Sequence, residues 1–446
     1  MKFKVGTLAW TCLAFLVSTP AAQALTLQEA YDAALQYDPV YRAAALENES
    51  GQFNRAIGKA ALLPVVSLSY TNSENTAQRT TPDLLGKDST QGYQYQSVAT
   101  TLSLKQPLLS YEGMAKYRQG QAQADYSGAT FKSRKQELAV RLITAYTDAL
   151  FAQDQVALAQ AQVKTLQEQK NLNERSLQAG EGTVTDLLET QSKYDVAQAQ
   201  VIEAQAEVDN TRQVLGGLLG RVLSVAEAVA GIREGFKPEP LVPATLDDWK
   251  ALALAGNADL QAQRYAVAAG QQDVAKNEAG HYPRVDLVAS NVRSRADSVV
   301  TYNQSSDISS LGIQVNIPLY AGGYVQASTS QALANLQRVV AELDGKTEKV
   351  VADLRKQFNL VRSSISRVEA LERAQDSAEK LIVATRKSVL GGVRVNLDVL
   401  TAQQQLYTVR RDLAQARYSY FTAWVKLRFA AGVMEDDDMT KLARQF

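Results

Sequence analysis

The chain lacks the residues on which most enzyme active sites depend. Its 446 residues include one cysteine, Cys12, and one histidine, His281. A single cysteine excludes an internal disulfide and a thiolate metal site. The lone histidine precedes a predicted strand, where a structural role is expected, and no Ser/His/Asp set, phosphate loop or metal-ligand spacing occurs. The sequence therefore predicts a protein that is not an enzyme and binds no cofactor or metal.

An excess of one charge and long apolar segments are also missing. Lys plus Arg and Asp plus Glu number 47 each, so the formal net charge is zero. This balance gives no indication of a nucleic-acid partner. Beyond the N-terminal region no segment approaches 18 consecutive apolar residues, which argues against a transmembrane helix there.

The N-terminus has the three parts of a secretory signal peptide. Two lysines precede an apolar segment, 5–17, and a small-x-small cleavage site follows at 22–24. We expect residues 1–24 to be removed, because the alternative, a membrane anchor, needs a longer apolar segment. Cys12 lies inside that segment and does not follow a lipoprotein cleavage site, so no lipid anchor is expected. Such an exported chain is periplasmic, extracellular or a β-barrel.

The sequence contains an internal duplication. Residues 26–68 align without a gap with 245–287, and residues 137–220 align with 349–432. Two copies of one unit indicate a pseudo-symmetric object and not an enzyme cleft. The expected regions are the signal peptide 1–24, a first repeat 25–237, a second repeat 238–432 and a peripheral acidic tail 433–446.

Two segments of each repeat predict long helices. Apolar residues recur at alternating spacings of three and four, which is typical of a coiled-coil seam. The clearest seams are Leu142, Ala145, Ala149, Ala152, Val156, Ala159, Val163 and Leu166; Ala197, Val201, Ala204, Val208, Thr211, Leu215 and Leu218; and Val399, Ala402, Leu406, Val409, Leu413, Ala416, Tyr420, Ala423, Leu427 and Ala430. No proline interrupts 112–177 or 324–389, and a helix of roughly 60 residues is about 90 Å long. This length favours an elongated barrel or rod over a compact helical bundle.

Each repeat also contains two short segments in which apolar and polar residues alternate. They are 65–71 and 98–104 in the first repeat and 285–290 and 311–317 in the second. Alternation over about ten residues is typical of a transmembrane β-strand, and tyrosines near both ends fit the membrane interfaces. A soluble four-stranded sheet packed on helices is the alternative. Prolines mark the strand–helix junctions, where a ladder hydrogen bond is not donated: Pro64, Pro107, Pro283 and Pro318.

The polar segments between the paired strands differ in length between the repeats. These segments, 72–94 and 292–307, are predicted to be extracellular loops, because insertions concentrate at loop tips. Four strands per chain cannot close a barrel, and open strand edges do not persist in lipid. Two chains would give eight strands with a filled interior, whereas three chains would give twelve strands and a lumen.

With these features together, the chain closely resembles the TolC family of outer-membrane channel proteins over about residues 25–432. The most specific pieces are Gln106-Pro107-Leu108, Ile317-Pro318-Leu319-Tyr320-Ala321-Gly322-Gly323, Gly180-Glu181-Gly182-Thr183-Val184-Thr185-Asp186-Leu187-Leu188 and Gly392-Val393-Arg394-Val395-Asn396-Leu397-Asp398-Val399-Leu400. The resemblance implies a mainly α-helical fold with transmembrane β-structure. In the implied homotrimer, a twelve-stranded outer-membrane β-barrel continues into a twelve-helix α-barrel in the periplasm. The implied partners are outer-membrane lipid, a periplasmic adaptor (membrane fusion) protein and an inner-membrane transporter.

The turns at 178–186 and 390–398 are expected to form the periplasmic tip and its gate. They carry the turn glycines Gly180, Gly182, Gly391 and Gly392. From the residues alone, Thr185 and Asp186, or Asn396 and Asp398, can also be read as helix caps. The resemblance implies that Asp398 belongs to an acidic ring that constricts the pore, and that Thr401 stands where relatives often have a second acidic residue. It also implies that Thr185 and Asp186 hold the closed state, with Arg394 as their basic counterpart.

The predicted function is that of the outer-membrane exit duct in type I protein secretion, with an inner-membrane ABC transporter as the motor. The absent lipidation cysteine is typical of the family members that serve such systems. The alternative is the outer-membrane component of a multidrug efflux pump, which would work with an RND pump. A soluble structural rod and a periplasmic adaptor are the competing classes without a channel.

Overall fold

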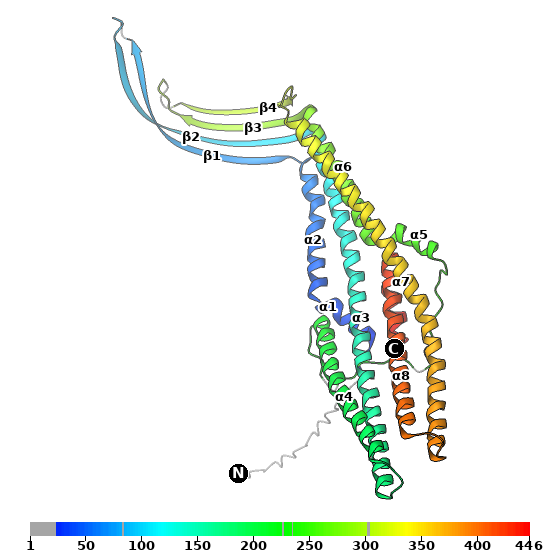
Figure 1. The fold of residues 1–446 in the computed structure, drawn as a ribbon. Coiled ribbons are helices and arrows are strands. Elements are labelled where there is room, and N and C mark those ends of the chain that lie inside the picture. Colours follow the sequence, from blue (N-terminus) through cyan, green and yellow to red (C-terminus); the bar gives the residue numbers. More distant parts are fainter. Residues whose placement is uncertain (1–23, 83, 225–226, 234, 301–303) are drawn as a thin grey trace, which may run out of the picture.

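The computed structural model describes residues 24–446 except 83, 225–226, 234 and 301–303, so residues 1–23 of the expected signal peptide lie outside the described chain. In order, the elements are α1 (Leu27–Tyr37), α2 (Pro39–Ala60), β1 (Val65–Pro82), β2 (Asp88–Leu109), α3 (Tyr111–Gln178), α4 (Val184–Leu219), α5 (Leu246–Gly256), α6 (Ala258–Glu278), the short 3₁₀ helix η1 (Ala279–His281), β3 (Arg284–Ala296), β4 (Ser305–Asn316), α7 (Tyr324–Leu390), α8 (Asn396–Ala431) and α9 (Asp436–Ala443). Two shorter helices, a strand hairpin and two long helices therefore occur twice, as Figure 1 shows.

The long helices have nearly the bounds that the uninterrupted sequence pattern predicts. α3 contains 68 residues and α7 contains 67, whereas α4 and α8 contain 36 each. At 1.5 Å per residue, α3 and α7 are each about 100 Å long. The side chain of Ser110 caps α3 by accepting the N–H of Gly113 at 3.0 Å. In the described part of the chain, no helix combines the length and apolar character needed to cross a membrane.

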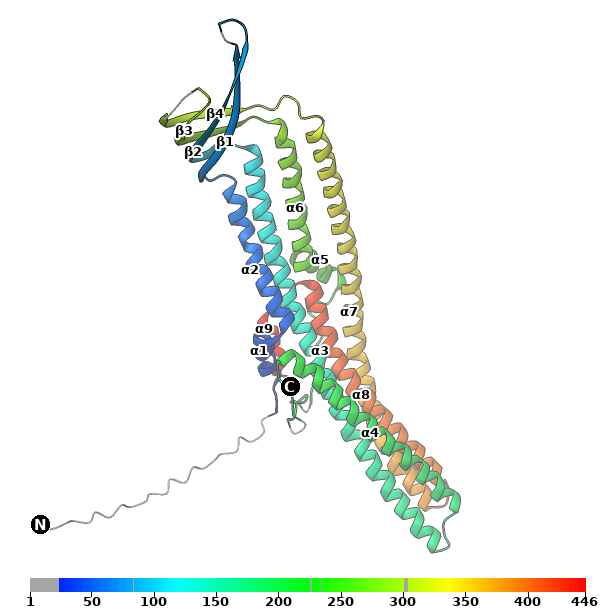
Figure 2. The same ribbon diagram turned by 90° about the vertical axis from the view of Figure 1, so that its left-hand side faces the viewer.

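The helices lie side by side in one layer. Next to the strands their order is α2, α3, α6 and α7, and at the other end it is α4, α3, α8 and α7. Only α3 and α7 run through both parts. Figure 2 shows the resulting rod, with the strands at one end and the α3–α4 and α7–α8 turns at the other. Within the described chain, α2 and α4 end the layer on one side and α7 ends it on the other, where only the short helices α1 and α5 make contacts with them.

The main hydrophobic core lies at mid-length, where both repeats meet. Tyr146 and Phe421 are almost fully buried there, and the ring of Phe446 packs against them at centroid distances of 5.4 and 4.8 Å. The Tyr146 hydroxyl donates to the carbonyl oxygens of Leu25 and Ala230 at 2.9 and 3.0 Å. This core fixes the two repeats to each other midway between the strands and the turns.

The C-terminal segment was expected to be a peripheral acidic tail, and this prediction is wrong. α9 packs Met439 and Leu442, three positions apart, into the main core. Asp438 is 2% exposed, and its carboxylate accepts hydrogen bonds from Arg428 and from the N–H of Glu435, both at 2.9 Å. The acidic residues of this segment concealed an amphipathic helix, because one of their carboxylates, that of Asp438, is buried and paired with Arg428.

The four strands form one antiparallel sheet in the order β1-β2-β3-β4, made of two hairpins. Its register gives the sheet two different faces, because side chains alternate along each strand. One face pairs Leu68 with Leu102 and Leu287 with Ile313. The opposite face holds the hydroxyl pairs Ser67–Ser103 and Ser290–Ser310, both at 2.7 Å, and the ion pair Lys105–Asp286 at 3.1 Å. Within the described chain, β1 and β4 are edge strands.

The strands are much longer than predicted. β1 contains 18 residues and β2 contains 22, and their ladder continues to the pair Pro82↔Asp88, so most of the expected loop 72–94 is strand. β3 and β4 likewise extend into the expected loop 292–307. Backbone hydrogen bonds need no apolar side chains, so the ladder extends beyond the apolar pattern. Pro107 lies within β2 at a register shift, and Pro64, Pro283 and Pro318 lie outside the strands next to their ends.

Asp38 forms a buried capping site between α1 and α2. It is 1% exposed, and its Oδ1 accepts the N–H of Tyr41 at 2.7 Å. Both carboxylate oxygens also accept hydrogen bonds from the Arg141 guanidinium, at 2.8 and 3.0 Å. Burial acts to raise the pKa of Asp38, but the hydrogen bonds from Arg141 and Tyr41 outweigh it and hold the pKa below its usual value. Asn257 occupies the equivalent cap in the second repeat.

Asp38→Ala is expected to lower the free energy of unfolding at pH 7 by about 3 kcal/mol, because Arg141 loses its buried partner and α2 loses its cap. Because the folded pKa is lowered, this contribution is present above the unfolded pKa and is lost as the pH falls through the folded pKa. The difference between wild type and variant should therefore shrink in acid. Denaturant unfolding at pH 7 and pH 3 measures it, and Asp125→Ala, which breaks only the exposed pair with Arg55, is the control. Equal stability of Asp38→Ala and wild type at pH 7 would contradict this account.

Candidate functional site

The two turns between the long helices share one backbone geometry. In the α3–α4 turn, the carbonyl oxygen of Ser176 accepts the N–H groups of the residues five and six positions later, at 2.9 and 3.0 Å. In the α7–α8 turn, Ser388 accepts the corresponding two N–H groups at 2.9 and 3.3 Å. Both turns lie at the end of the rod opposite the strands (Figure 1). The duplication thus produces two matching tips at one end.

Two of the predicted turn glycines require the conformation that glycine allows. Gly180 and Gly392 have φ values of 78° and 71°. A Cβ at Gly182 would lie 2.9 Å from the backbone nitrogen of Leu177. The matching position in the second turn holds Arg394, which makes the longer of the two bonds to Ser388. The second turn therefore has room for a side chain at its apex.

Each turn leads into a helix that carries an aspartate at its third position. Thr183 caps α4, and its Oγ1 accepts the N–H of Asp186 at 3.1 Å and donates to the Asp186 carboxylate at 2.6 Å. In α8 the carboxylate of Asp398 accepts the N–H of Val395 at 3.4 Å. Negative charge is favoured at a helix N-terminus. The reading of Thr185 as a cap is wrong, because Thr183 caps α4 and Thr185 is an exposed residue inside the helix.

The residues predicted to form the gate lie at the same end of the molecule but do not bind one another. Arg394 and Thr185 are exposed, and the hydroxyl of Thr401 donates to the carbonyl of Leu397 at 2.8 Å within α8. Within the described chain, no hydrogen bond or ion pair joins Arg394 to Thr185 or to Asp186.

Sequence reasoning missed a buried polar network that joins the two hairpins just above the turns. We call Gln169, Asn173, Thr190 and Asn396 the hairpin latch. Thr190 is 0% exposed, and Asn173 and Asn396 are each 9% exposed. The Thr190 hydroxyl accepts the side-chain amides of Asn173 at 2.8 Å and Asn396 at 3.2 Å, and donates to the carbonyl of Asp186 at 2.8 Å. The Gln169 amide donates to Asn396 at 2.9 Å and to Asn173 at 3.2 Å.

The hairpin latch connects α3 and α4 to the first turn of α8. Its hydrogen bonds are mutually satisfied, and such a network specifies one arrangement of the helices. A sequence signal for part of it exists, because Asn173 and Thr190 continue the alternating three-four spacing of the apolar seams, whereas Asn396 lies one position away from the seam of α8. A polar residue at a seam position is a known device for fixing the register of coiled coils. The pattern does not reveal which helix supplies the partner.

A second polar contact joins the hairpins farther from the turns. The hydroxyl of Tyr418 in α8 donates to Asp154 of α3 at 2.7 Å. Burial raises the pKa of Asp154, and the hydrogen bond from Tyr418 and the charge of Arg417 only partly oppose it. The described residues contain no cluster of His, Cys, Asp and Glu side chains that could hold a metal ion. The polar contacts in this half of the rod therefore join the α3–α4 hairpin to α8.

Comparison with known proteins gives a family and two close relatives. The family described as outer membrane efflux protein matches residues 30–221 and 249–433. The chain is 42% identical over 440 residues to the alkaline protease secretion protein AprF of Pseudomonas aeruginosa, covering 98% of this chain and 91% of the relative. It is 39% identical over 430 residues to the proteases secretion protein PrtF of Dickeya chrysanthemi, covering 96% and 93%.

The fold of the chain is similar to that of outer-membrane channels whose structures have been solved. The chain matches the outer-membrane channel OprN with a TM-score of 0.79 and 19% identity, over 92% of this chain and 90% of that chain. The long helix pairs and the four-stranded sheet belong to one architecture shared with that channel.

Proposed function

The chain belongs to the outer membrane efflux protein family, and from that premise we propose that it is the outer-membrane exit duct of a type I secretion system. The observation that carries the proposal is an open-edged sheet that continues directly into an open-edged layer of helices. The sheet and the helix layer of one chain are each part of the wall of a barrel, and neither closes on itself. The full-length similarity to two protease secretion proteins supports a secreted protein, of the protease class, as the cargo.

Closure of this wall needs further copies of the chain. β1 and β4 each leave one row of backbone groups unpaired within the described chain, which lipid does not tolerate. Three copies give a barrel of twelve strands with an open lumen. Two copies give a barrel of eight strands, and side chains fill the interior of such a barrel. The apolar face with Leu68, Leu102 and Ile313 suits lipid, and the face with Lys105 and Asp286 suits a water-filled lumen. In a homotrimer the apolar face contacts lipid, the polar face lines the lumen, and each edge strand pairs with a strand of the neighbouring chain.

The tips carry the gate in this proposal. In the proposed homotrimer three Asp398 carboxylates surround one axis, and Arg394, which is exposed in the single chain, binds Thr185 and Asp186 of the next chain. The Asp398 carboxylate accepts a backbone N–H of its own turn at 3.4 Å, which favours its orientation at the start of α8. Thr401, one turn later, adds no charge, and the ring of Asp398 is therefore single. A periplasmic adaptor that binds the hairpins and an inner-membrane ABC transporter complete the export path.

Single-channel conductance in planar bilayers tests the gate. Asp398→Ala is expected to reduce cation selectivity and to weaken block by trivalent cations by about tenfold or more, because three converging carboxylates are lost. Arg394→Ala is expected to raise the conductance, because a contact of the closed state is removed. Asp376→Ala, which removes a carboxylate from an exposed pair with Lys380 on α7, serves as the control. Wild-type conductance and cation block in both variants would show that the gate lies elsewhere.

A further inference from the structure

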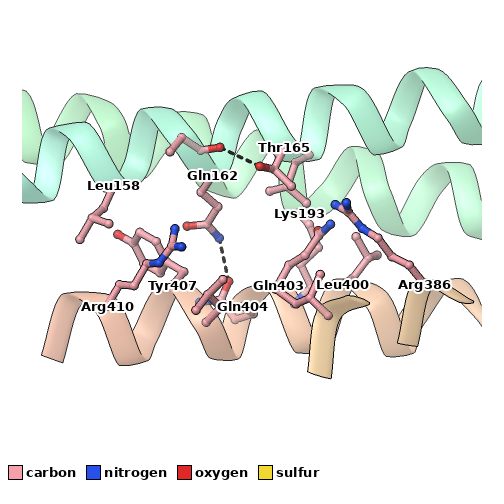
Figure 3. Close-up of a pocket in the computed structure, with 14 residues that line it drawn as sticks. Leu158, Gln162, Thr165, Lys193, Arg386, Leu400, Gln403, Gln404, Tyr407 and Arg410 are labelled. Carbon is pink, nitrogen blue, oxygen red and sulfur yellow. Dashed lines mark hydrogen bonds between the residues drawn. The ribbon is translucent and has the colours of Figure 1, made fainter. Parts of the chain in front are cut away.

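A cavity of about 230 Å³ lies between the two hairpins, on the strand side of the hairpin latch. All four long helices contribute to its lining, as Figure 3 shows. Leu158 and Leu166 of α3, Ile382 of α7, and Leu400 and Leu406 of α8 supply an apolar part. The volume and the apolar wall suit a small organic molecule.

The charged groups of the cavity all have one sign. Lys193 of α4, Arg386 of α7 and Arg410 of α8 line it, and no acidic residue does. Arg410 is bound to Glu379 at 2.8 Å. In the part of the chain that the structure describes, Lys193 and Arg386 have no hydrogen bond or ion pair. Two cations from different hairpins are therefore available to one anionic group.

A buried amide at the cavity also lacks a partner. Gln403 is 8% exposed, and neither its Nε2 nor its Oε1 has a hydrogen-bond partner within the described chain. The neighbouring Gln162 donates to Gln404 at 2.9 Å, but its own Oε1 has none. An unpaired buried amide is destabilising, and leucine would fill the same space without that cost. The Nε2–H of Gln403 can therefore donate to an acceptor on a ligand that the chain itself does not supply.

We propose that this cavity binds an amphipathic monoanion, a carboxylate on a short alkyl or aryl body. The carboxylate lies between Lys193 and Arg386 and accepts the Nε2–H of Gln403, and the apolar body lies along the leucines. Because the ligand touches α4 and α7 together, it binds the arrangement in which the hairpins are closed more tightly than any arrangement that separates them. Binding itself is independent of the channel's role, whereas this consequence for the gate rests on the proposed function.

The probe is 4-propylbenzoate, and 4-propylbenzyl alcohol is its uncharged counterpart. The full-length channel in lipid nanodiscs is titrated with each by calorimetry at pH 7, and empty nanodiscs give the background. We expect saturable binding of one carboxylate per chain and at least tenfold weaker binding of the alcohol. Lys193→Ala with Arg386→Ala, and separately Gln403→Leu, should each weaken carboxylate binding about tenfold, because each removes a charge-assisted or buried hydrogen bond.

Lys380→Ala is the matched control, because it removes a lysine of α7 that is paired with Asp376 and does not line the cavity. Thermal unfolding shows that each variant is folded, and Gln403→Leu is expected to unfold at a higher temperature than wild type. Equal binding of the acid and the alcohol, or no saturable binding of the acid, would overturn the site. Conductance recorded with the carboxylate should show fewer openings. A wild-type chain that forms no channel would refute the proposed function and leave the calorimetric result standing.

Discussion

Deletion of the gene for this chain is expected to reduce the secreted amount of its cargo protein to the level released by cell lysis, with little change in drug sensitivity. The physical reason is that a folded or unfolded polypeptide has no path through the outer membrane without a water-filled lumen. The similarity to AprF and PrtF over nearly the whole chain makes a protein the expected cargo. Comparison of the secreted proteome of deletion and parent strains measures the effect.

Two complementation controls make this experiment specific. The wild-type chain should restore secretion, and so should Lys380→Ala, whose changed side chain is exposed and paired only within α7. Genes next to this one that encode an ABC transporter and an adaptor would agree with the assignment. An unchanged secreted proteome together with sharply increased drug susceptibility would instead support the multidrug efflux alternative.

Loss of the hairpin latch is expected to open the channel. Asn396→Leu removes the bonds that link α8 to Gln169 and Thr190 and leaves their buried polar groups without this partner. Such a loss costs about 1–3 kcal/mol. Since 1.4 kcal/mol is a factor of ten, the closed state should become roughly tenfold less favoured against the open state. Single-channel recordings should show a higher open probability, and cells should become permeable to large antibiotics.

The control for the hairpin latch is the same substitution, asparagine to leucine, at a position outside the latch. Asn171→Leu removes an exposed amide that accepts a hydrogen bond from Gln167 within α3, at 2.8 Å. It should leave the open probability unchanged. A double-mutant cycle with Thr190→Val separates coupling between the hairpins from local destabilisation of α8. If Asn396→Leu has wild-type conductance and the two substitutions are additive, the latch does not hold the hairpins together.

The sequence predicted the helices better than the strands for a local reason. The seam of α3 and the absence of proline from 112 to 177 predict its bounds to within one residue, Tyr111–Gln178, because helical hydrogen bonds join residues four apart. In contrast, β1 and β2 extend far beyond their alternating apolar part, to the pair Pro82↔Asp88. Their ladder joins the two strands through backbone groups, and polar side chains do not mark where it stops.

In the candidate site, too, the sequence predicted the features built from neighbouring residues and missed those built from distant ones. The turns, their glycines and the aspartates that follow them are visible in the sequence, because a turn and a helix cap are each built within a few residues. Arg394 and Thr185 are recognisable as residues at the tips, but no contact between them exists within the described chain. The buried ion pair of Asp38 with Arg141 and the packing of α9 against the core were not predicted, because each depends on a partner more than a hundred positions away or on the other repeat.

The sequence by itself determined the duplication, the long helices and the glycine turns, all of which follow from local patterns or from the comparison of one segment with another. The tertiary structure decided which polar seam residues meet in the hairpin latch and which side chains surround the cavity at Gln403. These depend on how α3 and α4 lie against α7 and α8. That arrangement is set by packing over the whole length of the rod, so no single segment of the sequence contains it.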